Sequence, residues 1–110
     1  MEDKIRSLIN KYDVTIFSLS YCPWCMRAKR LTDGMGPRSV VEVDLLMDRG
    51  SPMRTKIDQT LRDIIKKDRG IDHGTYPKVF LCGTFIGGFS DLDAFLKRNG
   101  KPFHCRNNSN

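Results

Sequence analysis

Two cysteines separated by two residues form the part of this sequence that is best suited to chemistry. They belong to the segment Cys22-Pro23-Trp24-Cys25. A thiolate is the nucleophile in disulfide exchange, and a neighbouring thiol can resolve the mixed disulfide that the first one forms. The alternative is half of a zinc site, which needs a second ligand pair at similar spacing, and only the isolated Cys82 and Cys105 remain. The spacing favours redox chemistry over metal binding.

The position of this motif between a strand and a helix distinguishes the two thiols. A β-branched and aromatic run, Val14–Ser18, precedes it, and residues that favour a helix follow it. Pro23 suits the first helical position, where a missing N–H costs nothing. Cys22 is then at the helix N-terminus, where free N–H groups and the helix dipole stabilise a thiolate. We expect Cys22 to attack, and the less exposed Cys25 to stay protonated until it resolves the mixed disulfide.

Hydrophobic periodicity and turn residues predict the elements that position the motif. The expected order is a helix within the first dozen residues, the Val14–Ser18 strand, a helix from Pro23, a strand at 39–44, a helix at 52–66, a hairpin of strands at 78–82 and 84–86, and a helix introduced by a capping box at 90–93. This α-β-α-β-α-β-β-α order implies one α/β domain, 1–110, in which helices cover both faces of a mixed four-stranded sheet. Residues 101–110 are expected to be a mobile tail.

The composition of the chain limits the kinds of molecule that it is expected to bind. The chain has 110 residues, enough for one domain whose core needs no disulfide, and its formal net charge is +6. The basic residues are scattered and no aromatic stacking motif accompanies them, so we expect no nucleic acid, but small anionic ligands or acidic partners. The sequence shows no signal peptide and no apolar run of membrane length. We therefore expect a cytoplasmic monomer that does not bind membranes.

Three separated motifs carry a resemblance to a known family. They are Cys22-Pro23-Trp24-Cys25, Thr75-Tyr76-Pro77 and Gly87-Gly88-Phe89-Ser90-Asp91. In this order they resemble the CPYC, TVP and GGCSD motifs of the dithiol glutaredoxins, which are small glutathione-dependent oxidoreductases with a thioredoxin fold. One such motif alone is weak evidence, whereas the three together are specific. The resemblance covers about residues 5–98 and implies a thioredoxin fold with a four-stranded mixed sheet.

The resemblance also implies a set of glutathione-binding residues. The family's proline at the position of Pro77 is cis, and the backbone of Tyr76, next to Thr75, would pair with the cysteinyl part of glutathione. Gly88 would allow close approach, while Ser90 and Asp91 at the next helix start would hold the glutamyl end. An ordinary helix cap is the alternative for these two residues, and the two roles are compatible. Arg62 aligns loosely with a family position that contacts the glycine carboxylate.

Several residues depart from the family pattern or lie outside it. Leu19 occupies the position where the family usually has a lysine that supports the thiolate. Trp24 replaces the usual tyrosine of the active-site loop, beside Pro23, and is expected to be partly exposed. Phe89 replaces a cysteine and is expected to fill space. Lys78 is expected either to serve as the family's basic residue or to face solvent. Cys82 is expected to be buried in a strand and inert, and Cys105 to be an exposed thiol.

The function implied by the resemblance is that of a dithiol glutaredoxin. Such an enzyme reduces glutathione mixed disulfides and protein disulfides, with glutathione as reducing co-substrate and no metal. Two alternatives remain open. A thioredoxin-like protein recycled by a flavoprotein reductase is favoured by Leu19 and disfavoured by Ser90 and Asp91. A glutathione-ligated [2Fe–2S] dimer is disfavoured by Pro23, which stiffens the active-site loop.

Overall fold

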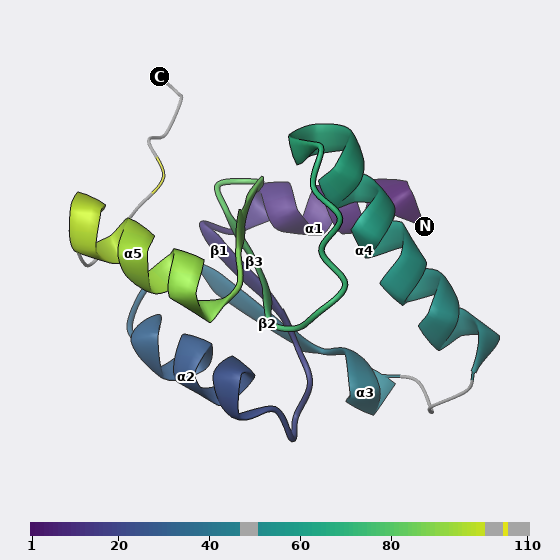
Figure 1. Ribbon diagram of the computed structural model, residues 1–110, viewed down its shortest axis with the longest axis horizontal. Helices are drawn as coiled ribbons and strands as arrows, with labels where there is room; N and C mark the ends of the chain where they lie inside the picture. Colours follow the sequence, from purple (N-terminus) through teal and green to yellow (C-terminus); the bar gives the residue numbers. More distant parts are fainter. Residues whose placement is uncertain (47–50, 101–104, 106–110) are drawn as a thin grey trace.

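The computed structural model describes residues 1–46, 51–100 and 105 of the chain. Its centre is a four-stranded sheet in the order β2-β1-β3-β4, in which β1 pairs in parallel with β2 and antiparallel with β3 (Figure 1). The strands are β1 Val14–Ser18, β2 Arg38–Glu42, β3 Lys78–Leu81 and β4 Thr84–Gly87. The helices are α1 Glu2–Lys11, α2 Pro23–Leu31, α3 Val43–Leu46, α4 Pro52–Arg69 and α5 Phe89–Asn99. This arrangement confirms the predicted mixed sheet flanked by helices.

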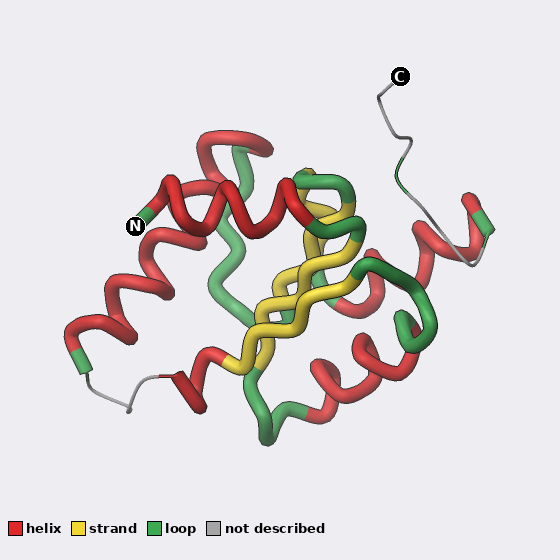
Figure 2. Tube along the Cα trace, turned by 180° about the vertical axis from the view of Figure 1, so that it is seen from behind, coloured by secondary structure: helices red, strands yellow, loops and turns green. Residues whose placement is uncertain are grey.

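Each strand supplies apolar side chains to both faces of the sheet, because successive side chains alternate in direction. Phe17 and Phe80 belong to one buried cluster, together with Leu61 and Ile64 of α4. Ile16 and Val79, their neighbours in the chain, belong to a second cluster with residues of α2 and α5. The helices α1 and α4 therefore cover one face of the sheet, and α2 and α5 cover the other, as the view from behind also shows (Figure 2).

Strand β2 and helix α4 differ from the sequence-based expectation because of tertiary contacts. The strand expected at 39–44 ends at Glu42, and the short helix α3 follows. In α3 the Asp44 carboxylate accepts hydrogen bonds from both the backbone N–H and the hydroxyl of Ser20, which holds the chain away from the sheet. Helix α4 continues three residues beyond the expected 66. Its last turn is held by pairs from Asp68 to Arg6 and from Lys67 to Glu2 of α1.

The predicted hairpin of β3 and β4 is confirmed, but Cys82 was placed wrongly. Cys82 and Gly83 are the two turn residues, with φ of 55° and 79°, as expected of a tight turn whose twist matches that of the strands. Cys82 is therefore exposed rather than buried in a strand.

Cys82 and Cys105 form a disulfide, with their Cα atoms 5.6 Å apart. The expectation of an inert Cys82 thiol and a free Cys105 thiol was wrong, because residues separated by 23 positions meet in space. The rest of the expected tail, 101–104 and 106–110, lies outside the described residues. Within the described ranges no helix combines the length and the apolar character needed to cross a bilayer.

Candidate active site

Cys22 occupies the N-cap position of α2, as the sequence predicts. Pro23 is the first helical residue, and the Cys22 sulfur accepts a hydrogen bond from the backbone N–H of Cys25 at 3.4 Å. The sulfur therefore takes the place that a serine or aspartate oxygen takes in an ordinary helix cap. Its thiol also lies 3.9 Å from the Tyr76 carbonyl oxygen. Cys22 is half-buried and reduced, so it is accessible for attack on a disulfide.

Cys25 lies one turn further along α2 and has no exposed surface. Its sulfur accepts a hydrogen bond from the backbone N–H of Leu19 at 3.4 Å. Burial raises the pKa of the Cys25 thiol to about 11, and the neighbouring Cys22 adds to the increase. Cys25 is therefore a protonated thiol near neutral pH, which agrees with the role expected of a resolving cysteine.

A cleft of about 420 Å³ lies beside these cysteines and joins the predicted site residues. Cys22 meets it through the contact with Tyr76, although its own side chain does not line the cleft. The active-site cleft is lined by residues from three parts of the chain: Trp24, His73, Thr75, Tyr76, Pro77, Gly88, Phe89, Ser90 and Asp91. All of the predicted glutathione-binding residues except Arg62 are in this set.

The Tyr76–Pro77 peptide bond is cis, as the resemblance predicts. The Tyr76 hydroxyl donates a hydrogen bond to the Asp58 carboxylate on α4. Burial, followed by this carboxylate, raises the pKa of Tyr76. The tyrosine ring is therefore fixed to α4, while its backbone faces the Cys22 sulfur.

Lys78 is a buried positioning residue, and the expectation that it faces solvent was wrong. Its side chain is 1% exposed, and its ammonium group donates hydrogen bonds to the carbonyl oxygens of His73 at 3.0 Å and Thr75 at 2.8 Å. It also lies 4.4 Å from the centre of the Tyr76 ring. Burial lowers the pKa of Lys78 to about 8. Lys78 therefore braces the segment before Pro77 from inside.

The start of α5 forms another wall of the cleft, with a cap that differs from the expected one. The helix begins at Phe89 with Gly88 as its N-cap, two residues before the expected cap at Ser90. The Asp91 carboxylate accepts a hydrogen bond from the Gly88 N–H at 3.2 Å. A Cβ on Gly87, whose φ is +134°, would lie 2.1 Å from an Asp91 oxygen, so glycine is needed there. Ser90 lines the cleft in the first turn of the helix.

Arg62 and the segment before Thr75 lie next to the cleft. Arg62 does not line the cleft and instead pairs with Asp72, with a guanidinium nitrogen 2.8 Å from a carboxylate oxygen. Asp72 raises the pKa of Arg62, and Arg62 lowers that of Asp72. His73, which no sequence motif identified, lines the cleft with its ring 3.3 Å from the Thr75 hydroxyl. Burial lowers its pKa, so His73 tends to be neutral.

The three departures from the family pattern have distinct surroundings. Trp24 is 51% exposed, and its ring centre lies 4.6 Å from the Arg27 guanidinium and 5.8 Å from the centre of the Phe89 ring. Phe89 is partly buried against the core cluster under α5, where it fills space as expected. It also lines the active-site cleft. Leu19 packs against the other core cluster, so an apolar side chain fits where the family has lysine.

The described residues contain no group of three or more histidine, cysteine, aspartate or glutamate side chains that could hold a metal ion. Cys82 and Cys105 are bonded to each other. They are therefore not free to complete a zinc site with Cys22 and Cys25.

A half-buried cysteine at the N-terminus of α2, a buried second cysteine and a cis-proline, all held by this sheet, define a thioredoxin-fold thiol–disulfide oxidoreductase. The family model for glutaredoxin matches residues 14–86, which is more than half of the chain. The chain is 31% identical over 99 residues to glutaredoxin-C2 of Arabidopsis thaliana, covering 89% of this chain and 78% of that protein. The chain therefore belongs to the glutaredoxin family.

Solved structures of this family have the same fold. Holo glutaredoxin C1 of Populus tremula x tremuloides gives a TM-score of 0.70 at 28% identity, covering 89% of this chain and 79% of that one. A buckwheat glutaredoxin–glutathione complex gives 0.66 at 28% identity, covering 91% and 81%. The chain spans 52% of the length of one curated relative that it matches and 79% of another.

Proposed function

We propose that this protein is a dithiol glutaredoxin that reduces glutathione mixed disulfides and protein disulfides. The observation that carries the proposal is the pairing of a half-exposed Cys22 sulfur, held by a backbone N–H, with a fully buried Cys25 thiol beside a cleft of about 420 Å³. The exposed sulfur has the access that a nucleophile needs. The buried Cys25 thiol stays protonated until it attacks a mixed disulfide on Cys22.

With a glutathionylated protein, the Cys22 thiolate attacks the glutathione sulfur of the mixed disulfide. A bond forms between Cys22 and glutathione, and the protein thiolate leaves and takes up a proton from solvent. A second glutathione, as thiolate, then attacks the glutathione sulfur on Cys22. Glutathione disulfide leaves and the Cys22 thiolate is regenerated, so each cycle consumes one free glutathione and converts the protein mixed disulfide into glutathione disulfide.

With a protein disulfide, Cys25 takes part. Cys22 attacks one sulfur of the client and forms a mixed disulfide with it. Cys25 then loses its proton and attacks the Cys22 sulfur, which releases the reduced client and forms the Cys22–Cys25 disulfide. Two glutathione molecules reduce that bond. The sulfurs are one helical turn apart, and the Cys25 N–H already points at Cys22, so little movement is required.

We assign the glutathione-binding role to the active-site cleft. The Tyr76 backbone beside Cys22 suits pairing with the cysteinyl part of glutathione, and Thr75 adjoins it. The start of α5 offers backbone N–H groups to the glutamyl carboxylate, near Ser90, while Asp91 suits the ammonium group. The glutathione complex of buckwheat glutaredoxin supports this choice of ligand. Arg62 would contact the glycine carboxylate of glutathione only if its ion pair with Asp72 were broken.

The test is turnover of a glutathionylated peptide with glutathione, glutathione reductase and NADPH, using the native protein, Cys22→Ser and Cys25→Ser. We expect native protein and Cys25→Ser to turn over and Cys22→Ser to be inactive. Reduction of a peptide disulfide should require both cysteines. If the native protein is inactive with glutathione but accepts electrons from thioredoxin reductase, the thioredoxin-like alternative replaces this proposal.

A further inference from the structure

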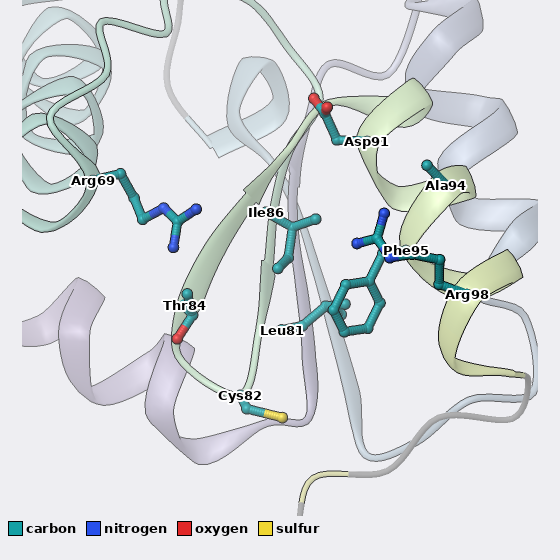
Figure 3. A pocket seen from close by; sticks show the side chains of 9 residues that line it. All are labelled: Arg69, Leu81, Cys82, Thr84, Ile86, Asp91, Ala94, Phe95 and Arg98. Atoms are coloured by element: carbon teal, nitrogen blue, oxygen red, sulfur yellow. The ribbon is translucent and has the colours of Figure 1, made fainter.

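A second hollow, distinct from the active-site cleft, runs along the outer edge of β4 (Figure 3). This edge groove has a volume of about 520 Å³. Leu81, Ile86 and Phe95 form its apolar floor, and Arg69 and Arg98 flank it. Figure 3 shows the two guanidinium groups reaching toward the groove from opposite sides of the strand. A hollow of this size is large enough to hold several residues of an extended peptide.

The edge of β4 is open to a further strand. β4 is the last strand of the sheet and pairs only with β3 among the residues that the structure describes. An unpaired strand edge presents backbone N–H and C=O groups that an extended peptide can pair with. Thr84 is exposed on this edge, and Ile86 beside it is only partly buried.

The charges at the edge groove favour an acidic partner. Arg69 ends α4 and Arg98 lies in the last turn of α5, and neither makes an ion pair within the described part of the chain. The acidic side chain that lines the groove, Asp91, is engaged with the Gly88 N–H. Two free guanidinium groups beside an apolar floor are suited to carboxylates on a peptide.

The placement of the two arginines also specifies the spacing of the acidic residues. They come from helices on opposite faces of the sheet, since α4 covers one face and α5 the other. Successive side chains of a strand point to opposite faces. A strand added to β4 would therefore reach both arginines with two adjacent acidic residues, whereas acidic residues two positions apart would both face the same helix.

The edge groove adjoins the active-site cleft, because Asp91 lines both. We propose that the edge groove docks an extended segment of a protein client as an added strand on β4, with adjacent carboxylates bound by Arg69 and Arg98. This inference rests on the function proposed above, because the segment belongs to a client whose disulfide Cys22 attacks. The groove would then select clients by a sequence beyond their reactive cysteine.

The first test measures binding by fluorescence anisotropy, using the labelled, cysteine-free peptide Thr-Val-Glu-Glu-Val-Thr. The controls are versions with Gln-Gln or Lys-Lys at the centre, and a version with the two Glu residues separated by Ala. We expect the Glu-Glu peptide to bind best. Arg69→Gln and Arg98→Gln should each weaken its binding about threefold, and together about tenfold, as expected for two exposed ion pairs. Lys66→Gln lies on the same helix as Arg69 and removes the same charge, and it should not weaken binding of the peptide.

Amide chemical shifts in NMR spectra locate the bound peptide. We expect the Glu-Glu peptide to shift the signals of Thr84 and Ile86 on β4, and a peptide with N-methylated backbone to lose this effect because it cannot pair with a strand edge. Equal binding of the Gln-Gln peptide, equal losses with Lys66→Gln, or shifts confined to another surface would overturn the docking proposal.

A third measurement separates this proposal from the function on which it rests. Bis(2-hydroxyethyl) disulfide is too small to reach the edge groove, so its reduction with glutathione tests the redox function alone. A peptide disulfide that carries the Glu-Glu segment should have a KM about tenfold lower than its Gln-Gln counterpart, and the double arginine variant should abolish the difference. Turnover of the small disulfide without this KM difference would refute the docking proposal and leave the redox function standing. Failure of the small disulfide would refute the redox function.

Discussion

The sulfur of Cys25 lies 3.4 Å from the backbone nitrogen of Leu19, in a position with no exposed surface. This contact predicts a thiol that is shielded in the folded protein. In Cys22→Ser, with the Cys82–Cys105 disulfide intact, we expect Cys25 to resist iodoacetamide at pH 8, because burial raises its pKa and keeps the reagent away from it. Mass spectrometry after timed alkylation measures the rate. In 6 M guanidinium chloride the same thiol should react readily, and a similar rate under both conditions would contradict the prediction.

Asp91 has a structural role as a helix cap and a proposed role in binding glutathione, and two substitutions separate them. Asp91→Asn keeps an oxygen that can accept the Gly88 N–H, so its unfolding free energy should change little, whereas Asp91→Ala should lose about 1 kcal/mol. Both should raise the KM for a glutathionylated peptide about tenfold, because the glutamyl ammonium loses its partner. Asp93→Asn, on the same helix but outside the cleft, is the matched control. A KM increase seen only with alanine would indicate a purely structural role.

The buried Lys78 predicts a pH dependence of stability. Between about pH 8, its folded pKa, and 10.5, its ordinary pKa, the unfolded chain holds a proton that the folded protein has lost. The free energy of unfolding therefore rises with pH in this window, by up to about 3 kcal/mol. Lys78→Met lacks this rise. Urea unfolding at several pH values measures the free energy of unfolding of the native protein and of Lys78→Met. Cys25 titrates in both proteins, so its contribution cancels in the difference between the two free energies. A difference that does not vary with pH would show that Lys78 keeps an ordinary pKa in the fold.

The disulfide between Cys82 and Cys105 should contribute to stability and not to turnover. It closes a loop between residues 23 positions apart, for which loop-closure entropy predicts about 3 kcal/mol. We expect Cys105→Ser and the double variant with Cys82→Ser to lose this amount in urea unfolding, and to reduce bis(2-hydroxyethyl) disulfide at the native rate. A thiol titration of protein with a reduced active site and an intact Cys82–Cys105 bond should count two free thiols. Four thiols in protein purified without reductant would rule out the bond.

Features carried by local sequence were predictable from the residues. Pro23 and Pro52 each begin a helix where expected, and the β-branched runs form the strands. The three motifs, far apart in the chain, do converge on one cleft. These predictions succeeded because capping and hydrophobic alternation act over a few residues.

Several of the failures involve contacts between distant segments. The end of β2 depends on Asp44 meeting Ser20, and the last turn of α4 depends on Arg6. The bond between Cys82 and Cys105 requires that the hairpin turn and the chain after α5 meet, which no local pattern encodes. The burial of Lys78 could not be predicted, because its buried partners are carbonyl oxygens, which every residue carries.

The open edge of β4 also bears on how copies of this protein behave toward one another. An unpaired strand edge invites pairing with an identical edge and, from there, aggregation. Two β4 edges brought together would place the Arg69 and Arg98 side chains of both copies around one seam, in proteins that each carry a net charge of +6. Electrostatic repulsion between these side chains opposes that pairing. The two arginines that would attract an acidic client therefore also disfavour self-association of the sheet at low ionic strength. High salt should weaken this effect, because it screens the charges.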